Sequence, residues 1–221
     1  MDWFPLFLSI KVASIAAIVS AVFAIPIGRL MARRHFWGKG VLEAIFLLPM
    51  VLPPTVVGFA LLMTFAKYGW LGDWLSKFNI NIIFTQFAAI MASAVVSFPL
   101  MYQNAKAGFS LVDTNLEKAA CTLGAGKLKT FFTISLPLAF PTLLAGFVLA
   151  FARALGEFGA TMMVAGNIPG RTQTLPLAIY FAMDAGDYVR AAKLVLVITI
   201  FSFVVILWSN WWLRKYKIKG R

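Results

Sequence analysis

The sequence predicts an all-α, polytopic membrane protein with about five transmembrane helices, and three observations support this fold class. Hydrophobic residues make up 61% of the 221 residues and charged residues only 13%. The mean hydropathy of +0.86 is too high for a soluble domain of this length. The apolar residues form separate runs, each about as long as the twenty residues that a bilayer core requires, and the cations gather at the ends of these runs.

Each apolar run predicts one span of a single transmembrane domain that covers residues 1–221. Three prolines between residues 49 and 54 interrupt the second run, and they free backbone carbonyls that need a neighbouring helix or a wet cavity. The segment 166–188 is too polar to cross the bilayer alone. The segment 67–81 contains two tryptophans and is typical of a membrane interface. The predicted spans are 6–27, 41–66, 82–102, 138–160 and 191–213.

The basic residues predict the orientation of the chain. One side of the predicted bundle carries most of them, whereas the other side carries four cations accompanied by four aspartates. Because cytoplasmic loops are enriched in Lys and Arg, we expect a cell-membrane protein with its N-terminus outside and its C-terminus in the cytoplasm. The predicted cytoplasmic cations are Arg29, Arg33, Arg34, Lys39, Lys106, Lys118, Lys127, Lys129, Arg214, Lys215, Lys217, Lys219 and Arg221.

The composition also argues against several classes of function. The net charge of +12 does not indicate nucleic-acid binding, because the cations do not follow one polar face. One cysteine, Cys121, and one histidine, His35, argue against a disulfide and a zinc site. No H-E-x-x-H motif or nucleophile–base arrangement favours a membrane-embedded enzyme. We therefore expect no metal, no cofactor and no catalytic residue, and the N-terminus MDWFP predicts no cleavable signal.

The segment 105–137 is too polar for a span and predicts a cytoplasmic helix. Thr114 and Glu117 stand in the S/T-x-x-E relation of a capping box, which predicts the start of a helix. Gly124 predicts its end in a left-handed cap, and a second amphipathic segment covers 127–136. A short capped helix with a small apolar face suits the groove of another protein. The apolar face consists of Leu116, Ala119, Ala120 and Leu123.

The spacing within this loop resembles the EAA loop of ABC importer permeases, in which an alanine pair is followed by a glycine and then by an apolar stretch ending in proline. The resemblance implies the type I ABC importer permease fold, and a coupling helix that docks on a cytoplasmic ATPase subunit. One position departs from the family, because Lys118 stands where the family has its glutamate and Glu117 lies one residue earlier. The alternative is an ordinary amphipathic surface helix. The implied ATPase-coupling residues are Glu117, Ala119, Ala120, Gly124, Ile134, Leu136 and Pro137.

The stretch GAGK at residues 124–127 does not predict a nucleotide site in this chain. A P-loop requires the pattern G-x-x-x-x-G-K-[ST]. Here Cys121 occupies the position of the first glycine and Leu128 follows the lysine. If transport is driven by ATP, the ATPase is therefore expected to be a separate polypeptide.

The region 151–180 resembles the permeases of molybdate transporters. It contains LGEFGAT, followed by NIPG and a run of alternating threonines that ends in proline. Sulfate and tungstate permeases share the GEFG element but diverge after Asn167. The resemblance implies an importer of molybdate, with tungstate also carried because the two tetrahedral dianions are close in size and charge. A sulfate permease is the alternative within the same class.

Four residues of this region are predicted to lie beside the transport pathway or its gate. Arg153 and Glu157 are four residues apart and share a helix face, so an intramembrane arginine has a partner. They could meet the passing oxyanion, or they could form a structural ion pair that steadies the fourth span. Thr172 and Thr174 are neutral donors near the outer mouth, where they could line a gate or serve only as polar loop residues.

The family resemblance also implies the partners. It implies two ATPase subunits at the cytoplasmic face and a molybdate-binding protein outside. Because five helices alone leave little room for a hydrated dianion, we also expect two copies of the chain to enclose the pathway as a homodimer. Closing of the ATPase dimer on ATP would then draw the coupling helices together and open the outer side. The alternative from another class is a secondary transporter or channel that works without ATP.

Overall fold

The computed structural model describes residues 3–219, apart from the side chains of residues 210 and 213–219. Every regular element in this part of the chain is helical, which confirms the all-α class. Four of the described helices are long and apolar enough to cross a membrane, and a bent pair of helices is a candidate for a fifth span. The side chains of the predicted cytoplasmic residues Arg214, Lys215, Lys217, Lys219 and Arg221 lie outside the described residues.

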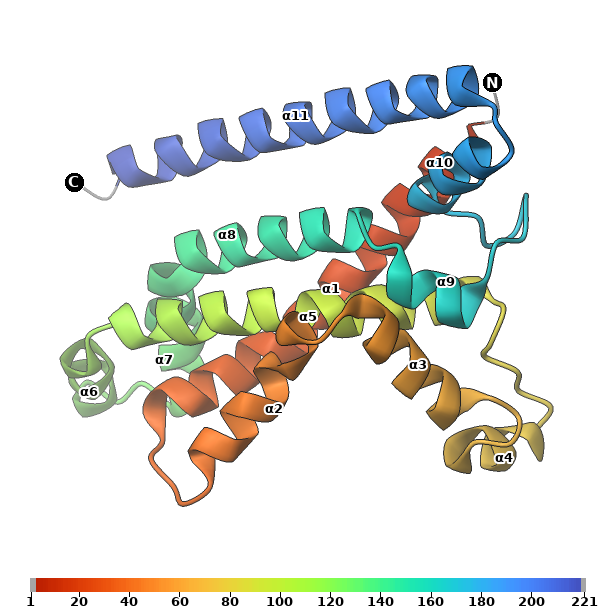
Figure 1. The fold of residues 1–221 in the computed structure, drawn as a ribbon. Helices are drawn as coiled ribbons and strands as arrows, with labels where there is room; N and C mark the ends of the chain where they lie inside the picture. Colours follow the sequence, from red (N-terminus) through yellow and green to blue (C-terminus); the bar gives the residue numbers. More distant parts are fainter. Residues whose placement is uncertain (1–2, 220–221) are drawn as a thin grey trace.

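The helices follow one another with short connections (Figure 1). Three consecutive elements, α7, η1 and α8, form one continuous helix that contains a π-helical segment. The bounds are α1 Phe4–Arg33, α2 Lys39–Val51, α3 Pro54–Phe65, α4 Trp70–Ser76, α5 Gln86–Leu111, α6 Thr114–Thr122, α7 Lys127–Thr130, η1 Phe131–Ser135, α8 Leu136–Leu155, α9 Gly159–Ala165, α10 Leu175–Asp184 and α11 Tyr188–Lys219.

The core of the bundle is formed by α1, α5 and α8, which pack against one another (Figure 1). Small residues allow this close approach. A Cβ atom at Gly28 of α1 would lie 2.7 Å from the Cβ of Ala105 in α5, and one at Gly146 of α8 would lie 2.5 Å from the Cβ of Asn104. Fully buried alanines fill much of the remaining contact: Ala13, Ala16, Ala17, Ala88, Ala89, Ala92, Ala105, Ala139 and Ala150.

The second predicted span, 41–66, is two helices rather than one. The axes of α2 and α3 differ by 111° across the break at Leu52 and Pro53. Consecutive prolines cause the break, because neither can donate a backbone hydrogen bond and each disfavours a helical residue before it. α2 begins at the end of the bundle where α6 lies, whereas α3 runs toward the opposite end and α4 (Figure 1).

The bounds of two other predicted spans also differ from the structure. The third, 82–102, is shifted, since Thr85 caps the N-terminus of α5 and the helix continues to Leu111. The predicted loop 105–137 therefore begins with the last turns of α5. The fourth, 138–160, ends at Leu155, because Gly156 leaves the helical conformation before α9 starts. The first and fifth predicted spans, 6–27 and 191–213, lie within α1 and α11.

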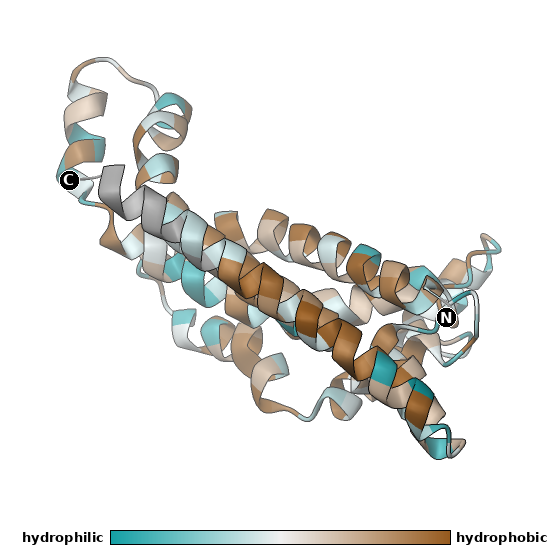
Figure 2. Ribbon diagram, turned by 90° about the horizontal axis from the view of Figure 1, so that it is seen from above, coloured by the Kyte–Doolittle hydropathy of each residue, from teal (hydrophilic) through white to brown (hydrophobic). Residues whose placement is uncertain are grey.

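The last helix, α11, is apolar along most of its length and packs mainly on α10, with a smaller contact to α8. Figure 2 shows its hydrophobic residues in a long stretch across the face of the bundle. Large side chains such as Leu196, Ile200 and Phe203 are exposed on it. A helix surface of this kind fits lipid hydrocarbon or another membrane helix.

Candidate functional site

The N-terminus of α6 is capped by a different residue from the one predicted. Oδ1 of Asp113 accepts a hydrogen bond from the backbone N–H of Asn115 at 2.8 Å, so Asp113 is the N-cap. Thr114 is already the first helical residue. The predicted capping box of Thr114 and Glu117 is therefore wrong, because the preceding aspartate is also a strong N-cap residue and begins the helix one position earlier.

The C-terminus of α6 ends in the predicted glycine cap. Gly124 has a φ of +85°, in the left-handed region that glycine adopts without strain. The N–H of Gly124 donates to the carbonyl of Cys121 at 3.0 Å, and the N–H of Ala125 donates to that of Ala120 at 2.9 Å. These two bonds form a Schellman motif, which confirms the left-handed cap and turns the chain sharply into α7.

Helix α6 lies at the end of the bundle beyond α5 (Figure 1), and most of its predicted apolar face is exposed. The side chains of Leu116 and Leu123 are 47% and 87% exposed. Ala119 is exposed and Ala120 is half-buried. The predicted apolar face of α6 is therefore largely exposed, and the remainder of this chain does not cover it.

Glu117 points in the opposite direction, into the protein. Its Oε1 accepts a hydrogen bond from the hydroxyl of Ser135, the last residue of η1. Its carboxylate oxygens lie 3.8 Å from Nη2 of Arg29 and 3.4 Å from Nη2 of Arg33, both on α1. The Glu117 side chain is only 19% exposed. Its carboxylate is therefore held by α1 and η1 instead of facing outward beside Ala119.

The two arginines also bind other parts of the same junction. Nη2 of Arg33 donates to the carbonyl of Val112, just after α5, at 2.9 Å. The guanidinium of Arg29 lies 4.3 Å from the ring centroid of Phe131 in η1, a cation–π contact. Sequence reasoning had used the arginines only for orientation and had not singled out Ser135. The signal was the spacing of four residues, which places both cations on one face of α1.

We refer to Arg29, Arg33, Glu117 and Ser135 as the Glu117 junction. It joins α1, α6 and η1, and through Val112 it also reaches the end of α5. Elements that are distant in the sequence thus meet at one partly buried carboxylate.

The remaining predicted coupling residues lie on the continuous helix after α6. Leu136 packs against the cluster of buried residues around Phe109, Ile134 is half-buried and Pro137 is exposed. The N–H of Leu136 donates to the carbonyl of Phe131, five residues earlier, as in a π-helix. This wider turn comes directly before Pro137, which has no N–H to continue the ladder.

Arg153 and Glu157 form an ion pair at the other end of α8, with Nη1 of Arg153 2.7 Å from Oε2 of Glu157. The Glu157 side chain is 1% exposed and that of Arg153 is 32% exposed. Oε1 of Glu157 also accepts a hydrogen bond from the N–H of Ala160 at 2.8 Å, which satisfies an N–H in the first turn of α9. The pair therefore stabilises the junction of α8 and α9, and the guanidinium of Arg153 remains partly exposed.

The predicted gate residues are buried, although the segment that carries them is a loop. Thr172 is fully buried, and its hydroxyl donates to the carbonyl of Gly166 and accepts from the N–H of Ile168, both at 3.2 Å. Thr174 is the N-cap residue of α10, and its buried hydroxyl has no hydrogen-bond partner among the described residues. The loop is thus closed on itself by Thr172. The predicted gating role of the two threonines remains untested.

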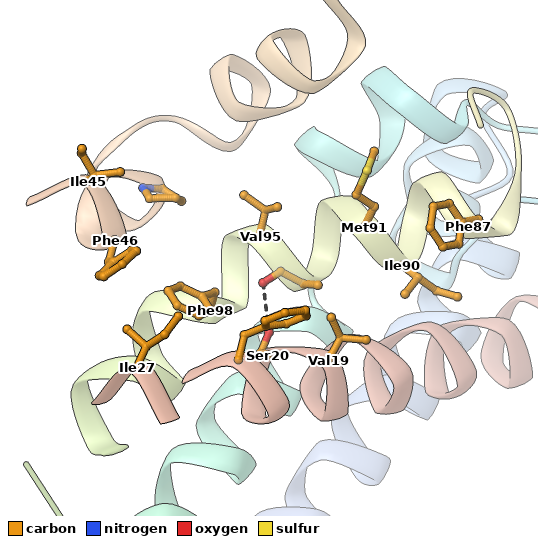
Figure 3. A pocket seen from close by; sticks show the side chains of 13 residues that line it. Val19, Ser20, Ile27, Ile45, Phe46, Phe87, Ile90, Met91, Val95 and Phe98 are labelled. Atoms are coloured by element: carbon orange, nitrogen blue, oxygen red, sulfur yellow. Dashed lines mark hydrogen bonds between the residues drawn. The ribbon is translucent and has the colours of Figure 1, made fainter. Parts of the chain in front are cut away.

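A groove of about 440 Å³ lies between α1, α2 and α5, and Figure 3 shows the side chains that converge on it. The lining is aliphatic and aromatic. The hydroxyl of its one serine, Ser20, already donates to the carbonyl of Ala94 at 3.0 Å. No cation lines the groove, so it suits apolar groups and not an oxyanion. Its lining residues are Val19, Ser20, Phe23, Ile27, Ile45, Phe46, Pro49, Phe87, Ile90, Met91, Ala94, Val95 and Phe98.

The chain is similar to permeases of oxyanion transport systems. It is 51% identical over 91% of its length to the Bacillus subtilis (strain 168) protein YvgM, provisionally named a molybdenum transport system permease protein, of which 89% is covered. It is 43% identical over 96% of its length to the molybdenum transport system permease protein ModB of Escherichia coli (strain K12), with 94% of that protein covered. A probable sulfate transport system permease protein of Nephroselmis olivacea is 35% identical, over 90% of this chain and 70% of that protein.

The fold is also that of a known importer subunit. A chain of the inward-facing methionine ABC transporter MetNI matches with a TM-score of 0.74 at 16% sequence identity, over 98% of this chain and 99% of that chain. This likeness confirms the predicted type I ABC importer permease fold. The family model for binding-protein-dependent transport system inner membrane components matches residues 24–217. The chain therefore belongs to this family, and it is a multi-pass membrane subunit of a transport system, not an enzyme.

Proposed function

We propose that this chain is the permease subunit of an ATP-driven importer of molybdate, with tungstate as a second substrate. One observation carries the choice of substrate. The identity to the Escherichia coli molybdenum permease is 43% over nearly the whole chain, against 35% for the sulfate permease of Nephroselmis olivacea. The region 151–180, with its LGEFGAT and NIPG elements, also supports molybdate as the substrate.

In this proposal α6 is the coupling helix that docks in a groove of a separate ATPase subunit. Its support is the exposed apolar face of Leu116, Ala119 and Leu123, together with the sharp turn at Gly124. A binding protein on the other side of the membrane delivers the oxyanion. Selection among oxyanions lies mainly with that protein, because carboxylates already pair with Arg29, Arg33, Lys106 and Arg153.

The proposed orientation places α6 in the cytoplasm and the N-terminus outside. Two features support it. The end of the bundle that carries α6 also carries Arg33, Arg34 and Lys39 at the end of α1 and the start of α2 (Figure 1). The opposite end carries α4 and the short connection between α10 and α11, where aspartates are found. The bent pair α2–α3 then crosses the membrane once, which gives five crossings.

The proposed homodimer uses the face of α2 and α3. None of the residues of α2 is buried within the chain, although the helix is apolar. Ile45, Leu48 and Met50 of α2 and Phe59 and Met63 of α3 are all about half exposed. A sharply bent pair also leaves backbone carbonyls near Pro53 that are poorly suited to lipid. A second copy, packed about a two-fold axis, would cover these groups and enclose the pathway.

The experiment is uptake by proteoliposomes that contain this chain and its ATPase subunit, with molybdate and the binding protein outside and ATP inside. We expect molybdate uptake that requires both ATP and the binding protein and that an excess of tungstate inhibits. An equal excess of sulfate should inhibit much less. Uptake that proceeds without the ATPase would refute the proposal in favour of a secondary transporter or channel. Sulfate uptake in place of molybdate would identify a sulfate permease.

A further inference from the structure

We propose that Glu117 is a positioning residue, whose carboxylate transmits the movement of α6 to α1 and to the start of α8. The inference rests on the proposed function, because it assigns a role within ATP-driven coupling. It differs from the expectation drawn from the sequence, in which Glu117 belonged to the surface that contacts the ATPase. The structure assigns docking to the exposed face of α6 and transmission to its inner face.

Apart from the contacts of Glu117, α6 has few contacts through which it could move the membrane spans. None of its residues is buried, and it packs only lightly, against α7 and η1. No other part of the protein packs against the turn at Gly124, since a Cβ atom there would meet no atom within 4 Å. Among the described residues, the side-chain polar contacts of α6 with the rest of the bundle are two ion pairs and one hydrogen bond from Glu117, and a longer contact between Cys121 and Thr130 of α7.

The contacts of Glu117 reach the end of α1 and the residue that precedes α8. Arg29 and Arg33 occupy the last two turns of α1, the helix that packs most closely with α5 in the core. Ser135 is the last residue of η1, immediately before α8. A displacement of the Glu117 carboxylate therefore acts on the ends of two membrane helices at once. Because the arginines also bind Val112 and Phe131, they cannot follow Glu117 without disturbing those contacts.

The π-helical segment η1 lies beside the same contacts. Single π-helical turns are rare insertions within α-helices and are frequent at functional sites. In this protein the insertion, Phe131–Ser135, has Phe131 under the Arg29 guanidinium at its start and Ser135 bound to Glu117 at its end. Both contacts belong to the Glu117 junction. Loss of the Glu117 carboxylate would therefore release one end of η1. The length of η1 sets the register of α8.

The test compares Glu117→Gln with Lys118→Gln in the assembled transporter. Lys118 is the exposed neighbour of Glu117 and its side chain has no contact among those found in the described residues, so it is the matched control. We measure molybdate taken up per ATP hydrolysed, together with co-purification of the ATPase. For Glu117→Gln we expect normal ATPase binding but a fall of at least about fivefold in uptake per ATP, since coupling energies of 1 kcal/mol or more have this effect. Lys118→Gln should leave uptake per ATP as in the unmodified chain, and any effect at this exposed position of α6 should appear as weaker co-purification of the ATPase.

Rescue by a second substitution distinguishes a positioning role of Glu117 from a general loss of folding. The double variant Glu117→Arg with Arg33→Glu restores an ion pair of opposite polarity between α6 and α1, and it should recover much of the coupling that either single change loses. Unchanged coupling in Glu117→Gln would overturn the proposal. So would loss of ATPase binding in Glu117→Gln alone, because Glu117 would then be a docking contact.

A second measurement tests the role of Glu117 separately from the proposed transport function. Amide hydrogen exchange of residues 114–122 in the purified chain does not depend on the substrate or on the ATPase. Glu117→Gln and Ser135→Ala should each accelerate exchange in α6, whereas Lys118→Gln should not. If the unmodified chain shows no ATP-driven uptake, the proposed function fails, and this exchange result still decides whether Glu117 holds α6. Unaltered exchange in both variants would refute the junction.

Discussion

Arg153 and Glu157 bind each other at 2.7 Å across the C-terminus of α8, while the second carboxylate oxygen of Glu157 accepts the N–H of Ala160 in α9. The ion pair thus links the last turn of α8 to the first turn of α9. The sequence had left two roles open for the pair, a contact with the passing oxyanion or a structural brace. The hydrogen bond to Ala160 supports the brace, and the 32% exposure of Arg153 leaves the first role open to experiment.

The first prediction concerns this pair. Glu157→Ala should lower the free energy of unfolding by about 1 to 3 kcal/mol, because it removes a helix cap and leaves Arg153 without its partner. Thermal unfolding in detergent measures the change. The double variant Arg153→Gln with Glu157→Gln keeps an acceptor for the Ala160 N–H and removes both charges, so its stability should be closer to that of the unmodified chain.

The same double variant separates the two roles. If the pair is only a brace, molybdate uptake by the folded double variant should remain within about twofold of normal. A folded double variant without uptake would show that the Arg153 charge serves the oxyanion. Either result is informative only when the unfolding temperature is measured on the same preparation.

The second prediction concerns the cap of α6. Gly124→Val places a β-branched residue at a φ of +85° and should cost about 1 to 2 kcal/mol locally. The turn after α6 would then open, and ATP hydrolysis should continue with reduced uptake. Gly126→Ala is the matched control, because Gly126 has a φ of −65° and a Cβ atom there would meet nothing within 4 Å. Normal uptake by Gly124→Val would count heavily against the coupling role of α6.

The third prediction concerns the core. Gly28→Val should destabilise the bundle by about 1 to 3 kcal/mol or prevent its accumulation, because the new side chain would overlap the Cβ of Ala105 and the backbone beside it. Gly40→Ala, at a position where a Cβ atom would meet nothing within 4 Å, should be tolerated. Detergent-solubilised yield and unfolding temperature provide the comparison. Equal stability of the two variants would contradict the close packing of α1 on α5.

The fourth prediction concerns the homodimer. Single cysteines at Ile45, Leu48 or Met50 of α2, introduced with Cys121→Ser, should give disulfide-linked dimers in membranes at one or more positions. Cysteines at Leu196 and Phe203 of α11 should give few, because that helix is expected to face lipid. Cross-linking confined to α11 would move the dimer interface away from α2 and α3. Gel electrophoresis without reductant reports the result.

Local patterns in the sequence were enough to predict the all-α membrane class, the capping glycine of α6 and the importer family. Each of these depends on residues that are close together along the chain. The hydrophobicity of each apolar run is enough to predict that the run lies in lipid. The turn at Gly124 is formed by hydrogen bonds within six residues. The start of α6 was predicted one position too late, because Asp113 and Thr114 are both good caps and only the backbone decides between them.

Tertiary structure alone decided which groups Glu117 meets and how the second span is bent. Arg29, Arg33 and Ser135 lie far from Glu117 along the chain, and no local pattern specifies that the ends of α1 and η1 converge on one carboxylate. The prolines indicated a break in the second span, but its angle of 111° depends on where α2 packs on α5 and α3 on α9. Pairings of this kind follow from the packing of whole helices, which a single sequence does not encode in any one segment.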